Sequence, residues 1–138
     1  MSDQNEPSTR GVHHVGLTVP ALAETRQFFM DTLGYEQVGE VPDYPAVFLS
    51  DGQVMITLWQ ARDRASATPF DRVQNLGLHH FAIRVREGRL DALHERLAER
   101  KDVEIEFGPE PLGGGPTRHM MTRIPGRIRV EFIAPVSA

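Results

Sequence analysis

Two pairs of adjacent histidines occupy matching places in this chain of 138 residues. The first pair lies in the stretch GVHHVGLTV (11–19) and the second in GLHHFAIRV (77–85). Four of the chain's six histidines therefore fall in one repeated pattern. Neutral imidazole is a common ligand for divalent transition metals. The repeat favours a site to which two equivalent strands each bring one imidazole.

Strand alternation selects one histidine from each pair. Neighbouring residues of a strand point to opposite faces, and Val15, Leu17 and Val19 form the apolar set of the first stretch. His14 belongs to the opposite, polar set, and His80 holds the same place in the second stretch. On this pattern His13 and His79 share the apolar parity. The other interpretation of each polar-face histidine is a hydrogen-bonded filler without a ligand.

A third candidate ligand lies in the last predicted strand. Glu131 is flanked by apolar residues in the stretch VEFI, where an unpaired carboxylate would be costly to bury. A cation held by His14, His80 and Glu131 would compensate it. The chain has no cysteine, so any metal must be held by histidine, carboxylate or water. Such a set suits one divalent ion: Zn, Ni, Co, Mn or Fe. The alternative is an ion pair between Glu131 and an arginine, with four candidates: Arg84, Arg118, Arg123 and Arg129.

Composition excludes several classes of function. The net charge is −4 and Lys and Arg form no sustained basic stripe, which argues against a nucleic-acid partner. No apolar run approaches the roughly 18–20 residues that a bilayer requires, so we expect no membrane partner. Residues 1–10 are polar and are expected to be a disordered lead-in rather than a signal peptide. A cytoplasmic location is the default expectation.

The repeat continues beyond the histidines. After the first stretch, apolar residues recur at near-helical spacing up to Gly34, and after the second stretch Leu90, Leu93 and Leu97 form one helical face. Alternating segments and two hairpins follow, one turned at Asp51-Gly52 and one around Pro125-Gly126. Both halves therefore predict the order βαβββ.

These elements define one domain over residues 11–138. It consists of a module at 11–61, a polar linker at 62–76 and a second module at 77–135. The second module also contains the stretch GPEPLGGGP, which we interpret as a surface loop or, alternatively, a flap over a pocket.

The repeated βαβββ unit, the histidines that open its first strands and the late VEF glutamate resemble the vicinal oxygen chelate superfamily. Its members include glyoxalase I, methylmalonyl-CoA epimerase, extradiol dioxygenases and the fosfomycin- and bleomycin-resistance proteins. The resemblance implies an α+β fold in which two tandem βαβββ modules form a curved mixed sheet around a shared metal-binding cavity. It implies His14, His80 and Glu131 as the metal ligands. It also implies a homodimer, since members of the family often complete the cavity across subunits.

One position departs from the resemblance. Glyoxalase I and the epimerase have a fourth ligand, a second glutamate, in the last strand of the first module, where this chain has Thr57. Three ligands are more similar to the fosfomycin-resistance and extradiol dioxygenase branches. The dioxygenase branch carries an acidic tyrosine ten residues before its ligand glutamate, and Met121 stands there. Met121 therefore weakens the dioxygenase interpretation.

The remaining candidate residues depend on strand register. If the turn consists of the three residues Ile124–Gly126, His119 lies directly across from Glu131 and is the candidate general acid or base. A two-residue turn would remove it from this face. A structural histidine is the alternative. There are six candidate substrate-binding residues. Thr57 is a polar side chain, and Arg123 and Arg129 could bind a substrate carboxylate. Trp59, Phe48 and Met121 would form an apolar wall.

The leading hypothesis is a divalent-metal enzyme of the glyoxalase-like lyase or isomerase type. Its small-molecule substrate would chelate the metal through two adjacent oxygens, and His119 would move the proton. The first alternative is an Fe(II)-dependent extradiol dioxygenase. The second is a metal-free binding protein of the bleomycin-resistance type, against which the ligand set argues.

Overall fold

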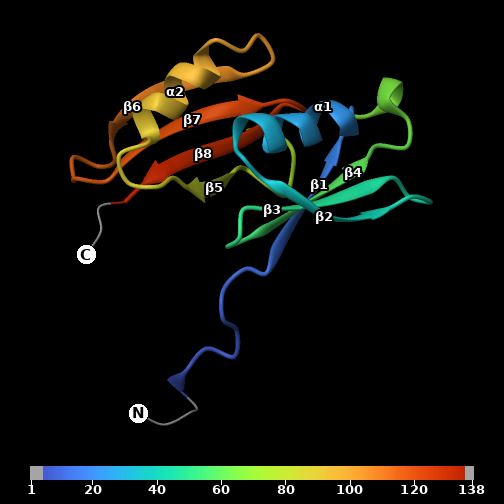
Figure 1. The fold of residues 1–138 in the computed structure, drawn as a ribbon, viewed down its shortest axis with the longest axis horizontal. Coiled ribbons are helices and arrows are strands. Elements are labelled where there is room, and N and C mark those ends of the chain that lie inside the picture. The colour runs from blue at the N-terminus through green and yellow to red at the C-terminus, as the bar shows by residue number, and fades with distance from the viewer. Residues whose placement is uncertain (1–4, 136–138) are drawn as a thin grey trace.

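Each histidine repeat opens a separate four-stranded sheet in the computed structural model, which describes residues 5–135 (Figure 1). The first sheet has the order β1-β4-β3-β2 and the second the order β5-β8-β7-β6. The first strand of each module runs parallel to its last strand, and the other pairs are antiparallel. The strands are β1 (His14–Val19), β2 (Glu36–Val41), β3 (Ala46–Ser50), β4 (Met55–Gln60), β5 (Phe81–Arg84), β6 (Glu104–Pro111), β7 (Arg118–Ile124) and β8 (Ile128–Ala134).

The predicted α+β fold of tandem βαβββ modules is confirmed. The two modules contribute two distinct sheets, with no strand pairing between them among the described residues, rather than one continuous sheet. A single turn of 3₁₀-helix, η3 (Arg64–Ser66), lies in the segment that joins them. Of the expected lead-in at 1–10, residues 1–4 lie outside the described residues and residues 5–10 are exposed.

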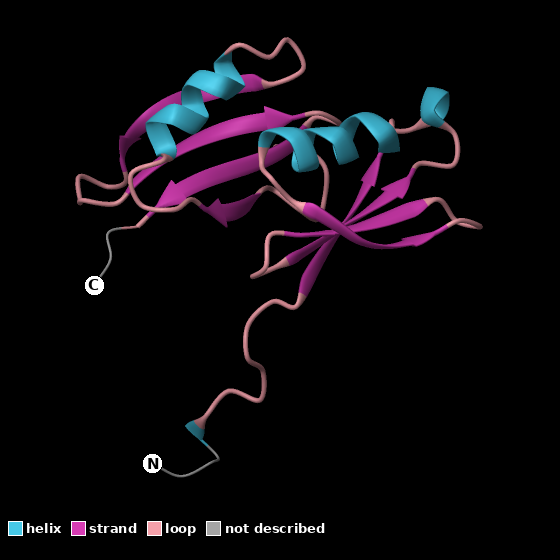
Figure 2. Cartoon of the chain, viewed as in Figure 1, coloured by secondary structure: helices cyan, strands magenta, loops and turns pink. Residues whose placement is uncertain are grey.

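One helix per module covers the same side of the two sheets (Figure 2). In the first module α1 (Leu22–Gln27) continues as a π-helical turn, η2 (Phe28–Thr32), and the chain leaves it through Gly34 at φ +79°. Phe28 and Phe29 are fully buried there. In the second module α2 (Leu90–Ala98) buries Leu90 and Leu97.

The helices join the two modules through a shared core. Apolar residues of both sheets belong to one buried cluster, including Leu58 of β4 and Phe132 of β8. Polar contacts cross the same boundary: Arg100 donates a hydrogen bond to Thr32 Oγ1 at 2.9 Å, and Thr25 Oγ1 donates to the Pro125 carbonyl at 3.2 Å. The helix-facing sides of both sheets are therefore used for packing, which leaves the opposite sides for a site.

The β7–β8 hairpin differs from the sequence prediction in its register. Ile124 pairs with Ile128, so the turn consists of residues 125–127 rather than 124–126. Gly126 and Arg127 both adopt positive φ, of 95° and 63°. As a result His119 pairs with Ile133 and not with Glu131. The predicted partner of His119 was wrong by two residues. His119 nevertheless keeps the same face of the sheet, because a shift of two residues preserves side-chain parity.

The stretch GPEPLGGGP forms less of a loop than expected. Strand β6 extends through Pro111, with register irregularities after Ile105 and Phe107 that accommodate its glycine and proline residues. The backbone closes between Leu112 N and the Thr117 carbonyl at 2.8 Å. The first-module hairpin does turn at Asp51-Gly52, where Asp51 Oδ1 accepts from the amides of Gln53 and Val54.

Replacing Phe132 by alanine is expected to destabilise the protein by about 3–5 kcal/mol, because it leaves a cavity at a fully buried site shared by both modules. Urea denaturation measures the change. Val73→Ala, at a side chain that is 83% exposed, is the control and should change the free energy of unfolding by less than about 0.5 kcal/mol. Equal effects of the two substitutions would contradict the shared core.

Candidate functional site

The two parallel strand pairs place equivalent residues of the modules in register. Gly16 of β1 pairs with Thr57 of β4, and Ala82 of β5 pairs with Glu131 of β8. Thr57 thus occupies in the first module the position that Glu131 occupies in the second. The first sheet carries a buried hydroxyl where the second carries a carboxylate.

Glu131 lies between two imidazoles. Its Oε1 is 3.5 Å from His80 Nε2, and its Oε2 is 2.5 Å from His119 Nδ1. The side chain of Glu131 is 14% exposed and that of His119 11%, whereas His80 is 33% exposed at the edge of the cluster. None of the four candidate arginines has a contact with Glu131 among the interactions of the described residues. The carboxylate is therefore hydrogen-bonded by His119 and faces His80, rather than being paired with a guanidinium.

The gap between His80 and Glu131 fits a metal ion better than a hydrogen bond. At 3.5 Å the nitrogen–oxygen distance exceeds the 2.7–3.2 Å of an ordinary N–H···O bond. In a tetrahedral site with bonds of about 2.0–2.2 Å, two ligand atoms lie about 3.3–3.6 Å apart. The donor set also suits a borderline divalent ion. His80 and Glu131 could therefore hold two corners of such a site.

His14 lies apart from this pair. It is exposed at the start of β1, and its Nδ1 is 2.9 Å from Nδ1 of His13. Within residues 5–135 no three His, Asp or Glu side chains are grouped so that they could hold a metal ion. The chain thus brings together two of the three predicted ligands.

His119 is fixed against Oε2 of Glu131, the carboxylate oxygen that does not face His80. Its ring packs edge-on against Phe107 with the centroids 5.0 Å apart, and its Nε2 is 3.9 Å from Glu110 Oε1. When Nδ1 is protonated it donates to Glu131, which orients the carboxylate. The second nitrogen is beyond hydrogen-bond distance of Glu110 and can therefore exchange a proton.

The two arginines predicted to bind substrate surround Glu106, a residue that the sequence did not single out. Arg129 donates to both oxygens of Glu106, at 2.8 and 3.2 Å, and Arg123 Nε lies 3.4 Å from Oε2. Arg72 from the linker approaches Oε1 at 3.5 Å. The side chain of Arg129 is 10% exposed and that of Arg123 26%, so Arg123 has the more accessible guanidinium.

This cluster shifts two pKa values. Burial raises the pKa of Glu106, but the hydrogen bonds and charge of Arg129, helped by Arg72 and Arg123, outweigh it and hold the pKa below its ordinary value. Partial loss of hydration and the positive charge of Arg129 lower the pKa of His79.

His79 corrects the expectation from strand alternation. Strand β5 begins only at Phe81, so His79 and His80 precede the regular pleat and do not alternate. His79 is exposed and contacts both Arg129 and His80 instead of packing in the core. His13 is likewise exposed, just before β1. No sequence period marks this departure, because it follows from where strand pairing starts.

The same face of the first sheet carries an aromatic surface. Trp59 Nε1 donates to Thr57 Oγ1 at 3.0 Å, and the Trp59 ring contacts Phe48 and Tyr44 at centroid distances of 6.1 and 5.0 Å. A Cβ on Gly16 would lie 3.0 Å from Thr57 Oγ1, so glycine permits this close approach. In the second sheet Met121 lies directly across from Glu131 and is 5% exposed.

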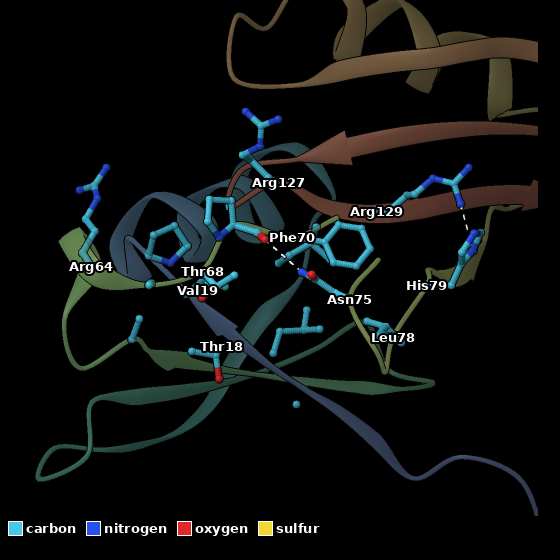
Figure 3. A pocket seen from close by; sticks show the side chains of 18 of the residues that line it. Thr18, Val19, Arg64, Thr68, Phe70, Asn75, Leu78, His79, Arg127 and Arg129 are labelled. Atoms are coloured by element: carbon cyan, nitrogen blue, oxygen red, sulfur yellow. Dashed lines mark hydrogen bonds between the residues drawn. The ribbon is translucent and has the colours of Figure 1, made fainter. Parts of the chain in front are cut away.

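A cavity of about 660 Å³ lies between the modules, beside the linker (Figure 3). Phe70, Leu76 and Leu78 from the linker region and its border line one wall, and Arg129 and His79 are at one end. Of the predicted site residues, it includes Arg129 but not His14, His80 or Glu131. No sequence signal marks this cavity, because the linker that forms its wall has no clear period.

The model of the family described as Glyoxalase/Bleomycin resistance protein/Dioxygenase superfamily matches residues 11–132. The chain belongs to this superfamily. It is the vicinal oxygen chelate superfamily that the histidine repeat resembles. No curated relative matches the chain at a significant level.

Several solved structures share the fold. A glyoxylase/bleomycin resistance protein/dioxygenase domain from Frankia sp. EAN1pec has a TM-score of 0.77 at 24% identity, covering 95% of this chain and 96% of that one. A candidate glyoxalase from Bacillus halodurans is 30% identical, with a TM-score of 0.72 and coverage of 90% and 95%. A variant of the fosfomycin resistance protein FosX from Listeria monocytogenes, complexed with Mn(II) and 1S,2S-dihydroxypropylphosphonic acid, has a TM-score of 0.72 at 18% identity and coverage of 93% and 94%.

These similarities establish superfamily and fold. The superfamily contains enzymes and small-molecule-binding proteins, so membership does not select one reaction. Among the described residues, no helix has the length and apolar character needed to span a bilayer.

Glu106→Gln is expected to destabilise the protein by about 1–3 kcal/mol at pH 7, because it weakens charged hydrogen bonds to Arg129. The pKa of Glu106 is lowered by folding, so its contribution is complete above the unfolded value of about 4.3 and is lost as pH falls through the folded value. Denaturation of both proteins across this range should show the difference shrinking at acid pH. The matched control is Glu104→Gln, at a side chain that is 63% exposed and 3.6 Å from Arg123. It should cost less than about 1 kcal/mol, and a pH-independent difference for Glu106→Gln would contradict the assignment.

Proposed function

We propose that this protein is a divalent-metal-dependent enzyme whose metal is held by His80 and Glu131 of one chain and His14 of the partner subunit. Its substrate is a small molecule that chelates the ion through two adjacent oxygens, and its chemistry is of the glyoxalase-like lyase or isomerase type. The observation that carries the proposal is the pair of ligand atoms, His80 Nε2 and Glu131 Oε1, facing each other at 3.5 Å.

The position of His14 supports a site completed by a second copy. His14 is exposed, and the first sheet presents on the same face an aromatic surface that includes Trp59. Large apolar side chains within the two histidine repeats are also exposed, Val12 at 73% and Leu78 at 45%, and Tyr44, whose ring contacts Trp59, is 55% exposed. Contiguous exposed apolar surface commonly marks a protein–protein contact. A homodimer in which the first module of one chain meets the second module of the other would cover it.

The ligand count supports a chelating substrate. When bound, the ion would act as a Lewis acid that polarises a substrate oxygen and stabilises developing negative charge. Three protein ligands leave further positions free, and Thr57 supplies no carboxylate to fill one. The FosX complex contains Mn(II) together with a vicinal diol, a ligand of the kind proposed here.

The protein's own residues divide the remaining tasks. His119 holds Glu131 through Nδ1 and exchanges the substrate proton through its other nitrogen. Met121, with Phe48 and Trp59 of the first sheet, provides an apolar wall that excludes water. Arg123 is the better placed of the two arginines to bind an anionic substrate group, because its side chain is 26% exposed, whereas that of Arg129 is 10% exposed and bound to Glu106 and His79.

Metal content tests the ligand set directly. Wild-type protein is expected to bind close to one divalent ion per chain, whereas His14→Ala and His80→Ala should each bind little metal while remaining folded. After full exchange of an equal mixture of the two variants, half of the dimers are mixed, and each mixed dimer contains one intact site built from both chains. The mixture should therefore recover about a quarter of the wild-type metal content, measured by elemental analysis.

Three outcomes of that experiment would overturn parts of the proposal. Absence of any metal from the wild type after reconstitution would favour a metal-free binding protein. Full metal content in both single variants would remove His14 and His80 as ligands. Failure of the mixture to recover any metal would contradict a site shared between subunits.

Substitution of His119 tests the proposed reaction. At saturating metal, His119→Gln is expected to lower kcat by about 10²–10⁴-fold on hemithioacetal substrates, because it removes the proton-exchanging group. Phe107→Leu, which alters the packing of the same ring, is the control and should change kcat far less. Oxygen uptake with catechols under ferrous iron, in place of hemithioacetal turnover, would assign the dioxygenase reaction instead.

A further inference from the structure

His79 is contacted from two sides at one ring nitrogen. Arg129 Nη1 lies 3.1 Å from His79 Nδ1, as the dashed line in Figure 3 marks. The same His79 nitrogen lies 2.8 Å from Nδ1 of His80. A guanidinium group has donors but no acceptor. Nδ1 of His79 must therefore be the acceptor, and it carries no hydrogen.

This assignment passes from His79 to His80. Two ring nitrogens 2.8 Å apart require one hydrogen between them, since two lone pairs at that distance repel. His79 Nδ1 cannot supply the hydrogen, so Nδ1 of His80 does. A neutral imidazole carries only one N–H. In neutral His80 the lone pair is consequently on Nε2, the nitrogen that faces Glu131 Oε1.

The guanidinium of Arg129, from which these hydrogen-bond assignments start, is itself held in place. Arg129 binds both oxygens of Glu106, at 2.8 and 3.2 Å, and its side chain is only 10% exposed. A bidentate pair restricts the plane of the guanidinium as well as its position. The Nη1 that contacts His79 is thus directed by a contact on the far side of Arg129.

The first module provides a natural comparison. Nδ1 of His13 and His14 also lie close, at 2.9 Å. By strand register, however, the position that Arg129 occupies in the second module is occupied in the first by Met55 of β4, which pairs with His14 of β1. No arginine contacts His13 among the interactions of the described residues, so nothing there selects between the two tautomers. The directed arrangement belongs to the second module.

We propose that Arg129, acting through His79, is a positioning residue that fixes His80 as the Nδ1-protonated tautomer and so presents its Nε2 lone pair to a divalent cation beside Glu131. The cation rests on the proposed function, whereas the tautomer exists without it. Histidine ligands in proteins usually donate their other N–H to a fixed partner, and loss of that partner typically weakens metal binding 10–100-fold. Here the partner is a second histidine whose acceptor role is imposed by an arginine.

The tautomer can be measured on the metal-free protein. Long-range ¹H–¹⁵N NMR, at a pH where the imidazoles are neutral, should show His80 protonated on Nδ1 and unprotonated on Nε2. Arg129→Met, which copies the residue at the equivalent position of the first module, should give His80 a mixture of tautomers and leave His14 unchanged. His79→Phe should have the same effect with the Arg129–Glu106 pair intact. His79→Asn, which retains an acceptor near the Nδ1 position, should preserve the wild-type signal.

Binding of Zn²⁺ alone, followed by calorimetry, provides the second readout. Arg129→Met and His79→Phe are expected to weaken affinity about 10- to 100-fold, and His79→Asn much less. Arg123→Met is the control, because Arg123 contacts Glu106 but not His79. The inference is overturned if His80 is protonated on Nε2 in the wild type, or if its tautomer is unchanged in His79→Phe. A fixed tautomer in a wild-type protein that binds no metal would instead overturn the proposed function and leave the positioning intact.

Discussion

The arrangement of the second module depends on one constraint, the need to compensate the carboxylate of Glu131 on an apolar strand. A charge that is 14% exposed beside Val130 and Phe132 cannot rely on water. The protein meets this need with His119 hydrogen-bonded to one carboxylate oxygen, and the other oxygen faces His80 across 3.5 Å, where the proposed cation would lie. The two contacts differ in kind: one is a short hydrogen bond, while the other leaves a gap of the size that a coordinated ion spans. The same carboxylate thus links the stability of the strand to the chemistry proposed for the site.

A second charged group, Glu106, supports the candidate metal ligand His80 indirectly, through Arg129 and His79. The three arginines around it could have formed an anion-binding surface, yet Arg129 is committed to Glu106 and His79. The result is a continuous line of polar contacts from the β6 strand to the candidate ligand His80. Because Arg129 can only donate hydrogen bonds, the donor and acceptor of each contact along this line are fixed: His79 accepts through Nδ1, and His80 donates through Nδ1. The site is in this sense organised by hydrogen-bond donors and acceptors as much as by charge.

The duplicated modules are alike in backbone and different in chemistry. Both use a parallel pairing between the first and last strands and a helix on one side. By strand register, Thr57 of the first sheet is equivalent to Glu131 of the second, and Met55 is equivalent to Arg129. The first sheet instead carries aromatic side chains around Trp59. One module therefore supplies most of the ligands, and the other supplies His14 and an apolar wall. Such a division of tasks is consistent with a site formed where unlike modules meet.

Local sequence pattern was enough to define the βαβββ repeat and the buried faces of most strands, and to single out Glu131. Periodicity carries this information because apolar faces must be buried wherever the chain folds. The pattern did not define the register at residues 125–127, since Arg127 enters the turn with a positive φ that its residue type rarely adopts, which shifts the turn by one residue. It misplaced His79, because alternation applies only after strand pairing begins at Phe81. It also missed Glu106, whose partners come from β7, β8 and the linker. The convergence of His80, Glu131 and His119, with His14 lying apart, became visible only in three dimensions, because it depends on how two sheets are set against each other and not on the pattern within either one.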